Sequence, residues 1–188
     1  AEFDFAAVME RVQRVVQAVE PHDSIERYTE LGVEVIEGTA TIVSPWEVAI
    51  ACHDGSTRRL TTRSMVIAAG GRPFVPPIPG LDDVGYLTSD TVWALRELPK
   101  RLMVLGGGPI GAELAQAFAR LGAQVTLVQQ GPRILSREEP DVSEFVMQRF
   151  RAEGIDVRVD HQAMKFIVEN GEKILLAEHA GREVRIAF

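Results

Sequence analysis

The spacing of apolar residues divides the chain into a helical start, a β-rich middle and a second half in which helices and strands alternate. Residues 4–20 carry the stripe of an amphipathic helix. The stripe consists of Val8, Val12, Val15, Val16 and Val19. Pro21 interrupts it. Asp23, with Glu26 three residues later, predicts the capped start of a short helix that ends near Leu31.

Between residues 33 and 70 the pattern becomes that of β-strands. Runs at 33–37, 39–43, 47–52 and 57–60 are separated by turn residues, and Asp54-Gly55 is a hairpin signal. These runs predict a small antiparallel meander. An apolar run over residues 64–70 predicts one more strand. The prolines of residues 72–80 exclude helix and predict an extended connector, followed by a brief helix over 91–98.

The second half alternates strands and helices. Strands are predicted at Leu102–Leu105, Val125–Val128 and Ile155–Val159, with helices from the glycines after Leu105 to Gly122 and from Pro140 to Glu153. We expect Ile110, Leu114, Ala117, Phe118 and Leu121 to form the apolar face of the first helix, and Val142, Phe145, Val146, Arg149 and Phe150 that of the second. Three further β-type runs at 163–169, 173–178 and 183–188 finish the chain. The second half therefore predicts an α/β fold with a parallel sheet and a β-meander.

The most informative segment is Gly106-Gly107-Gly108-Pro109-Ile110-Gly111, a G-x-G-x-x-G motif. It lies between a predicted strand and the helix that it opens, which is the context that gives the motif meaning. Gly106 permits the tight turn, Gly108 lets the backbone approach a pyrophosphate, and Gly111 lets the helix pack closely on the strand. The free N–H groups and the positive end of the helix dipole favour phosphate there. The segment predicts a dinucleotide-binding site.

Composition and charge remove several classes of function. The 188 residues carry a net charge of −7, which argues against nucleic-acid or anionic-membrane partners. Cys52 is the single cysteine, so an internal disulfide is impossible, and its expected role is that of a small half-buried side chain. The four histidines lack the spacing of a metal motif, and we expect no metal site. Without a secretory signal, the expected compartment is the cytoplasm.

The order of several motifs resembles the pyridine nucleotide-disulfide oxidoreductases, the family of dihydrolipoamide dehydrogenase and mercuric reductase. The motifs are VIAAGGRP at 66–73, PPIPG at 76–80, TSD at 88–90 and LPKRLMVLGGGPIGAELA at 98–115. The resemblance implies an internal piece of such an enzyme. Residues 1–90 would be part of an FAD-binding domain, a helix with an antiparallel meander. Residues 91–188 would be a Rossmann-like NAD(P)-binding domain, truncated at its C-terminal end.

The resemblance also implies roles for residues near the glycine motif. Glu113 matches a glutamate that lies near the nicotinamide ring in the family, although a solvated helix-face glutamate is the alternative. The acidic residue that binds the adenosine ribose in NAD-preferring members is replaced by Gln129, with Gln130 and Arg133 nearby. Loss of the carboxylate removes a repulsion against a 2′-phosphate, and Arg133 or Arg137 could contact that phosphate. We therefore expect NADPH rather than NADH, although Gln129 can also bond a 2′-hydroxyl.

For FAD, the resemblance implicates residues in two segments of the first half. Thr39 and Ala40 fall where backbone groups contact the adenine, and Ala69 and Gly70 fall on the strand that approaches the cofactor. Ala69 replaces a common threonine of the family, and Arg72 either reaches the same region or anchors its loop. The family's first glycine motif and its C-x4-C redox disulfide do not occur in this sequence. We therefore expect weak FAD binding, or none, by the chain alone.

The predicted function is a part of a flavin-dependent oxidoreductase, in which hydride passes from NAD(P)H to FAD and then to a redox disulfide and a small-molecule acceptor. The residues leave two alternatives open, a non-catalytic NAD(P)H sensor and a flavin transhydrogenase without redox cysteines. The family implies a homodimeric parent enzyme. The acceptor is not specified by this stretch of sequence.

Overall fold

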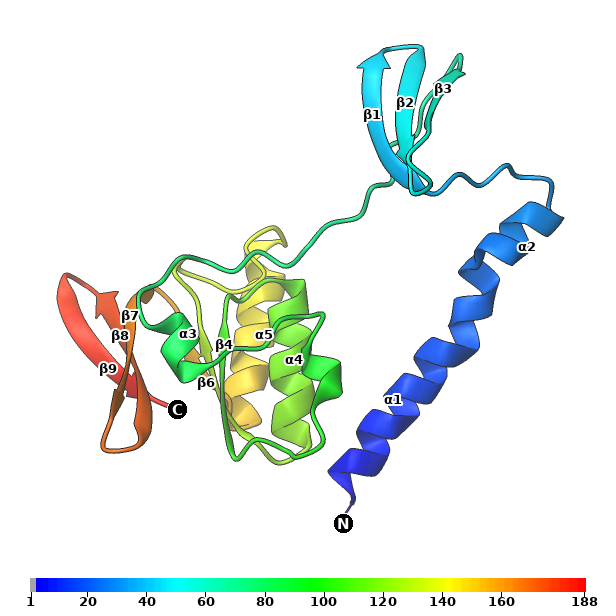
Figure 1. Cartoon of the computed structure of the whole chain (residues 1–188). Coiled ribbons are helices and arrows are strands. Elements are labelled where there is room, and N and C mark those ends of the chain that lie inside the picture. Colours follow the sequence, from blue (N-terminus) through cyan, green and yellow to red (C-terminus); the bar gives the residue numbers. More distant parts are fainter. Residues whose placement is uncertain (1–2) are drawn as a thin grey trace. The chain divides into compact units, whose positions relative to one another are not determined.

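The computed structural model describes residues 3–188, which form two compact units (Figure 1). One unit holds Pro73–Phe188 together with the beginning of the first helix, up to Arg11. The other unit holds Val12–Arg72. The domain boundary expected near Asp90 concerns the complete enzyme and stays a prediction.

The first helix, α1, spans Phe5–Val19, as its valine stripe predicts. A 3-10 turn, η1 (Glu20–Asp23), and a short helix, α2 (Ile25–Glu30), follow it. Strands β1 (Gly38–Ser44), β2 (Glu47–Cys52) and β3 (Thr57–Thr61) pair antiparallel in chain order. The predicted meander is thereby confirmed, and its second turn contains Asp54-Gly55.

Three predictions for this part of the chain are wrong. Residues 33–37 and 64–70 form no strand. An apolar strand needs neighbours to satisfy its backbone, and no strand of residues 3–188 pairs with 64–70, where Val66 is 91% exposed. Helix α2 is capped by Ser24, whose hydroxyl accepts from the Arg27 N–H at 3.2 Å, and not by Asp23.

The second half contains the predicted parallel sheet. Strands β4 (Arg101–Leu105), β5 (Gln124–Val128) and β6 (Asp156–Arg158) are ordered β4-β5-β6, with Leu105 beside Val128 and Val128 beside Arg158. Helix α4 (Pro109–Arg120) connects β4 to β5, and α5 (Pro140–Ala152) connects β5 to β6. This βαβαβ arrangement brings the carboxyl ends of all three strands to one edge of the sheet.

Smaller elements complete the same unit. The extended proline segment leads into α3 (Leu81–Val84), and a 3-10 turn, η2 (Val92–Ala94), replaces the helix predicted over 91–98. Strands β7 (Gln162–Glu169), β8 (Glu172–His179) and β9 (Arg182–Ala187) form an antiparallel C-terminal sheet from the three predicted β-type runs. A second small core, which includes Phe166 and Leu175, lies beneath this sheet.

The main core lies between the parallel sheet and its two helices, and the buried helix faces agree with the predicted ones only in part. Helix α4 buries Ala112, Ala115 and Phe118, and α5 buries Ser143, Met147 and Phe150. Ile110 and Phe145, expected in the core, are 60% and 69% exposed. Phe118 and Phe150 are buried as predicted, and Leu114, Leu121 and Val146 pack against the core in partly buried positions. Hydrophobicity therefore located each buried face only in part.

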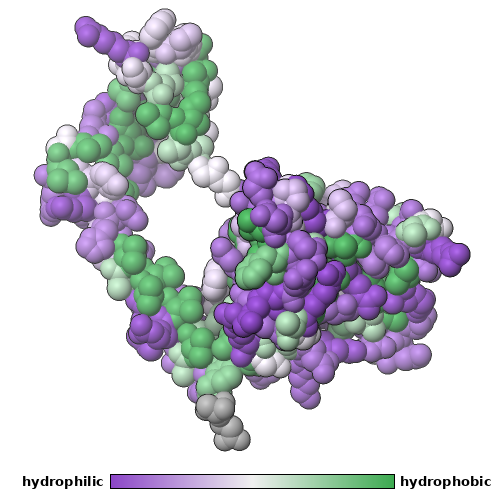
Figure 2. Space-filling model, turned by 180° about the vertical axis from the view of Figure 1, so that it is seen from behind, coloured by the Kyte–Doolittle hydropathy of each residue, from purple (hydrophilic) through white to green (hydrophobic). Residues whose placement is uncertain are grey.

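Only the first turns of α1 pack into this core. Phe5 and Met9 are buried there, and the Phe5 ring lies 6.1 Å from that of Phe118. Farther along the helix, Val15, Val16 and Val19 are about half exposed, and Figure 2 shows hydrophobic surface along this helix. Within residues 3–188, none of the helices has the length and apolar character needed to cross a bilayer.

Candidate functional site

The glycine motif forms a tight turn at the carboxyl end of β4. Gly106 has φ +104°, a left-handed conformation that favours glycine, and its N–H donates to the Val128 carbonyl at 2.8 Å. Gly108 is the N-cap of α4, and its carbonyl accepts from the Ala112 N–H at 2.9 Å. A Cβ on Gly108 would meet no atom within 4 Å. The surface above the start of the helix is therefore open.

The other two glycines are required by close packing. A Cβ on Gly111 would overlap the Gly106 carbonyl oxygen. A Cβ on Gly107 would lie 2.5 Å from Cγ2 of Ile134. The motif thus keeps one face against the protein and leaves the opposite face, above Gly108, free for a ligand.

The segment after β5 holds both backbone groups of Gly107. The Gly107 N–H donates to Oε1 of Gln129 at 2.8 Å, and the Gly107 carbonyl accepts from the Leu135 N–H at 2.6 Å. Because an N–H can only donate, the amide oxygen of Gln129 must face the glycine turn. Its Nε2 then lies on the side of Gly131. Gln129 therefore presents a hydrogen-bond donor at the end of β5.

The same segment carries Gln130 and Arg133, two further residues predicted for this site. Gln130 is exposed, and Arg133 is partly buried, with its guanidinium donating to the Ser136 carbonyl at 3.0 Å. The buried Ser143 hydroxyl of α5 donates to the Ile134 carbonyl at 2.5 Å. Helix α5 thereby fastens the segment that carries Gln129 and Arg133.

The carboxyl end of β6 adds residues that sequence reasoning missed. The Gln129 N–H donates to the Arg158 carbonyl at 2.8 Å, and the His161 N–H donates to the Gln129 carbonyl at 3.0 Å. The Arg158 side chain donates to both carboxylate oxygens of Asp156 at 2.8 Å. These residues could have been found from their place at the end of a predicted strand, because residues that end neighbouring parallel strands gather at one edge of the sheet.

The predicted nicotinamide-side glutamate lies on α4. Glu113 is exposed, and no acidic residue occupies the first turn of this helix. The first turn of α4 therefore contains no carboxylate that would neutralise the positive end of the helix dipole. The role of Glu113 stays a prediction.

The flavin-side residues are not gathered into one cavity. Thr39 and Ala40 lie exposed on β1, and Ala69, Gly70 and Arg72 lie in an exposed irregular segment of the same unit. The sheet itself is closely built, since a Cβ on the neighbouring Gly38 would overlap the Ala51 carbonyl oxygen. The predicted FAD contacts stay predictions.

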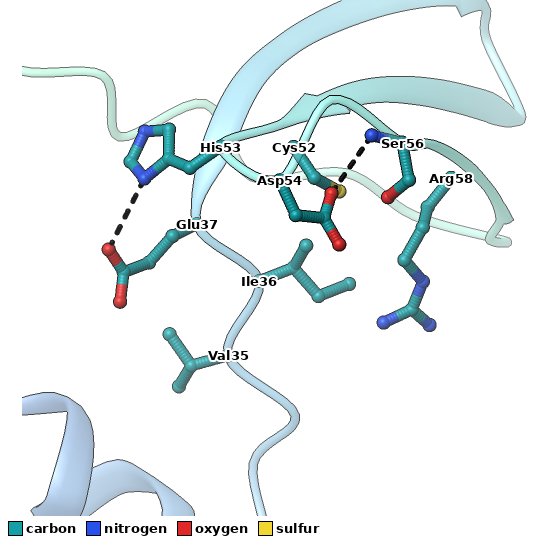
Figure 3. A pocket seen from close by; sticks show the side chains of 8 residues that line it. All are labelled: Val35, Ile36, Glu37, Cys52, His53, Asp54, Ser56 and Arg58. Carbon is teal, nitrogen blue, oxygen red and sulfur yellow. Dashed lines mark hydrogen bonds and ion pairs between the residues drawn. The ribbon is translucent and has the colours of Figure 1, made fainter.

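An open hollow of about 390 Å³ lies beside β2 in the unit Val12–Arg72 (Figure 3). Among its lining residues, His53 pairs with Glu37 at 3.5 Å, and the Ser56 N–H donates to Asp54 at 2.9 Å. His53 turns toward Glu37 and away from the sulfur of Cys52, which is half-buried as expected. No three His, Cys, Asp or Glu side chains in residues 3–188 are placed to share a metal ion. The hollow offers no paired nucleophile and base.

Comparison with known proteins gives matches along most of the chain. The family model described as pyridine nucleotide-disulphide oxidoreductase matches residues 5–187. Mercuric reductase of Streptomyces lividans is 43% identical over 154 residues, covering 80% of this chain and 32% of the relative. That of Lysinibacillus sphaericus is 31% identical over 185 residues, covering 97% of this chain and 33% of the relative. The chain thus spans about a third of the length of these relatives.

Solved structures give the same result for the fold. A cysteine-to-serine mutant of the flavoprotein disulfide reductase RclA of Escherichia coli, in a Cu(II) complex, matches with a TM-score of 0.79 and 25% identity, over 98% of this chain and 41% of that one. LpdA of Mycobacterium tuberculosis matches with a TM-score of 0.76 and 24% identity, over the same shares of the two chains. The predicted α/β fold class is confirmed.

Proposed function

The chain belongs to the pyridine nucleotide-disulphide oxidoreductases, and we propose that it carries the NAD(P)H-binding site of a flavin-dependent enzyme of that family. The observation that carries the proposal is the open glycine turn between β4 and α4. Its left-handed Gly106 and its unobstructed Gly108 suit the close approach of a pyrophosphate to the first N–H groups of the helix.

In this proposal each residue binds or orients a part of the coenzyme. The backbone of Gly106, Gly107 and Gly108, with Pro109, Ile110 and Gly111, lines the pyrophosphate. Glu113 borders the nicotinamide side of α4, and Gln129 with Gln130 and Arg133 borders the adenosine ribose. When bound, the flavin would take up hydride from the nicotinamide and pass electrons to a redox disulfide.

We also propose a preference for NADPH. The Gly107 N–H holds the amide oxygen of Gln129, so that the Nε2 donor lies away from the glycine turn, on the side of Gly131. A donor is suited to a phosphate oxygen, and Gln129 carries no negative charge to repel one. Arg133 lies four residues on in the same segment and supplies the positive charge. These observations support the preference, and coenzyme titration tests it.

Thr39, Ala40, Ala69, Gly70 and Arg72 are proposed to line one part of an FAD site, whose other walls would come from the rest of a complete enzyme. Such an enzyme would also supply the strand neighbours that residues 64–70 lack, and a dimer interface. The names of the relatives, mercuric reductase and disulfide reductase, favour a small acceptor such as a metal ion or a disulfide. We propose a cytoplasmic homodimer of this kind.

Calorimetric titration of the 188-residue chain with NADPH and NADH tests the site. We expect NADPH to bind more tightly, and a Gly108→Ala variant to keep its fold but lose most of the affinity, because its Cβ would project into the free face of the turn. Tighter NADH binding would contradict the coenzyme preference alone. Absence of binding by both coenzymes would overturn the site.

The flavin content of a complete enzyme tests the sensor alternative. A complete protein that binds NADPH but is colourless would favour that alternative.

A further inference from the structure

Two histidines stack against each other at the edge of the sheet that carries the proposed site. His161 follows β6 and is 7% exposed, and His179 ends β8. Their ring centroids lie 4.2 Å apart with only 11° between the planes. The contact joins the parallel sheet to the C-terminal antiparallel sheet.

Both rings are oriented by hydrogen bonds to backbone carbonyls. Nδ1 of His161 lies 2.6 Å from the Val159 oxygen, and Nδ1 of His179 lies 2.9 Å from the Asp160 oxygen. A carbonyl oxygen only accepts, so each Nδ1 carries the hydrogen and donates it. Asp160 itself has φ +55°, which is uncommon for a residue with a side chain. Both histidine side chains are therefore bonded to one corner of the main chain, residues 159–161.

This corner is bonded directly to the end of β5. The His161 N–H donates to the Gln129 carbonyl at 3.0 Å, and the Asp160 N–H donates to the Gly131 carbonyl at 2.9 Å. Gln129 is the residue whose side chain accepts from the glycine turn. A displacement of the corner would therefore move the main chain on both sides of Gln130.

We propose that His161 and His179 are positioning residues for the adenosine end of the coenzyme. They act through Asp160 and the backbone of Gln129, and they keep the Gln129 amide directed at Gly107 on one side and at the ribose on the other. The inference rests on the proposed function, because it assigns the pair to the ribose end of that same site. His179 is the residue to vary, since it holds the corner through its side chain alone.

The test is calorimetric titration of the 188-residue chain and its variants with 2′,5′-ADP, the adenosine half of NADP. His179→Ala removes the donor and the stack, and we expect Kd to rise about three- to tenfold, the value of one net hydrogen bond. His179→Asn is the matched control, because its amide nitrogen can replace Nδ1 as donor to Asp160. We expect it to bind within about twofold of the parent chain, as the donor is retained. His179→Phe keeps a stacked ring without the donor and should weaken binding as alanine does.

The outcomes separate this inference from the proposed function. A merely structural role would lower the Tm of the variants without changing the Kd of the folded chain, measured well below each Tm. Unchanged affinity in His179→Ala, or an equal loss in His179→Asn, would therefore overturn the positioning role and leave the coenzyme site intact. Absence of NADPH, NADH and 2′,5′-ADP binding by the parent chain would overturn both.

Discussion

At the scale of single residues, the candidate site depends on which groups can donate and which can accept. Gly107 has its N–H bonded to the Gln129 side chain and its carbonyl bonded to the Leu135 N–H. The glycine turn and the segment after β5 are therefore one hydrogen-bonded structure. A change at Gln129 reaches both the turn and the proposed ribose position.

Gln129→Glu should change coenzyme preference without disturbing the turn. A carboxylate can still accept from the Gly107 N–H, but it adds a negative charge where a 2′-phosphate would lie. Two unit charges about 4 Å apart repel by roughly 1 to 4 kcal/mol near a protein surface, so the NADPH/NADH affinity ratio should fall at least about fivefold. Calorimetric Kd values for both coenzymes give this affinity ratio. Gln129→Ala is the comparison variant. An unchanged NADPH/NADH affinity ratio in Gln129→Glu would place the 2′-phosphate elsewhere.

Ser143→Ala should destabilise the fold by about 1–3 kcal/mol, because it leaves the buried Ile134 carbonyl without its donor. Urea unfolding, followed by circular dichroism, measures the free energy of unfolding. Ser136→Ala is the matched control, since Arg133 bonds only the backbone carbonyl of Ser136. Equal stability of the two variants would show that the Ser143 hydrogen bond does not hold the segment.

At the scale of elements, one carboxylate joins the ends of α4 and α5. Glu153, the C-cap of α5, accepts from Arg120 at 2.9 and 3.0 Å, from Arg149 at 2.6 Å and from Gln116 at 3.1 Å. These bonds, that from Arg120 foremost, lower the pKa of Glu153 from 4.5 to about 2. The charged form is therefore favoured in the folded chain.

The acid stability of the chain should depend on this carboxylate. A pKa that folding lowers gives stability that is present in full above the ordinary value near 4.5 and is lost as pH falls toward about 2. The Tm of the parent chain should therefore decline more steeply across this interval than that of Glu153→Gln, which should melt lower near neutral pH. Glu144→Gln, an exposed residue of the same helix, serves as control. Parallel Tm profiles for parent and Glu153→Gln would contradict the assignment.

The parallel half of the fold was predictable because its signals are local. Buried parallel strands appear as continuous apolar runs, Gly106–Gly111 marks a strand-to-helix turn, and Pro140 begins α5. The run at 64–70 has the same local signal but lacks a neighbouring strand among residues 3–188, so it stays extended and exposed. Pattern alone could not show that a partner was missing.

Contacts between distant elements could not be predicted in this way. The exposed Ile110 and Phe145 resemble core residues, because hydrophobicity does not show which side of a helix faces the sheet. The bond from Gly107 to Gln129 and the stacking of His161 on His179 depend on how strand ends meet in space. The sequence supplied the candidate site residues near the glycine motif, and the structure supplied their hydrogen-bond and packing partners.

At the scale of the whole molecule, every residue proposed to bind NAD(P)H lies in Pro73–Phe188. A shortened chain of residues 73–188 should therefore bind NADPH within about twofold of the 188-residue chain, since no proposed contact is removed. It should be less stable by several kcal/mol, because Phe5 and Met9 no longer fill the core against Phe118.

Calorimetry at a temperature where both chains are folded by circular dichroism measures the affinities. Phe5→Ala in the 188-residue chain separates the loss of core packing from the loss of the second unit, because it opens the core while retaining Val12–Arg72. If the shortened chain were folded but failed to bind NADPH, residues before Pro73 would have to contribute to the site. If it bound as tightly as the longer chain, coenzyme binding and the flavin-side residues would be carried by separable units, as the division of contacts indicates.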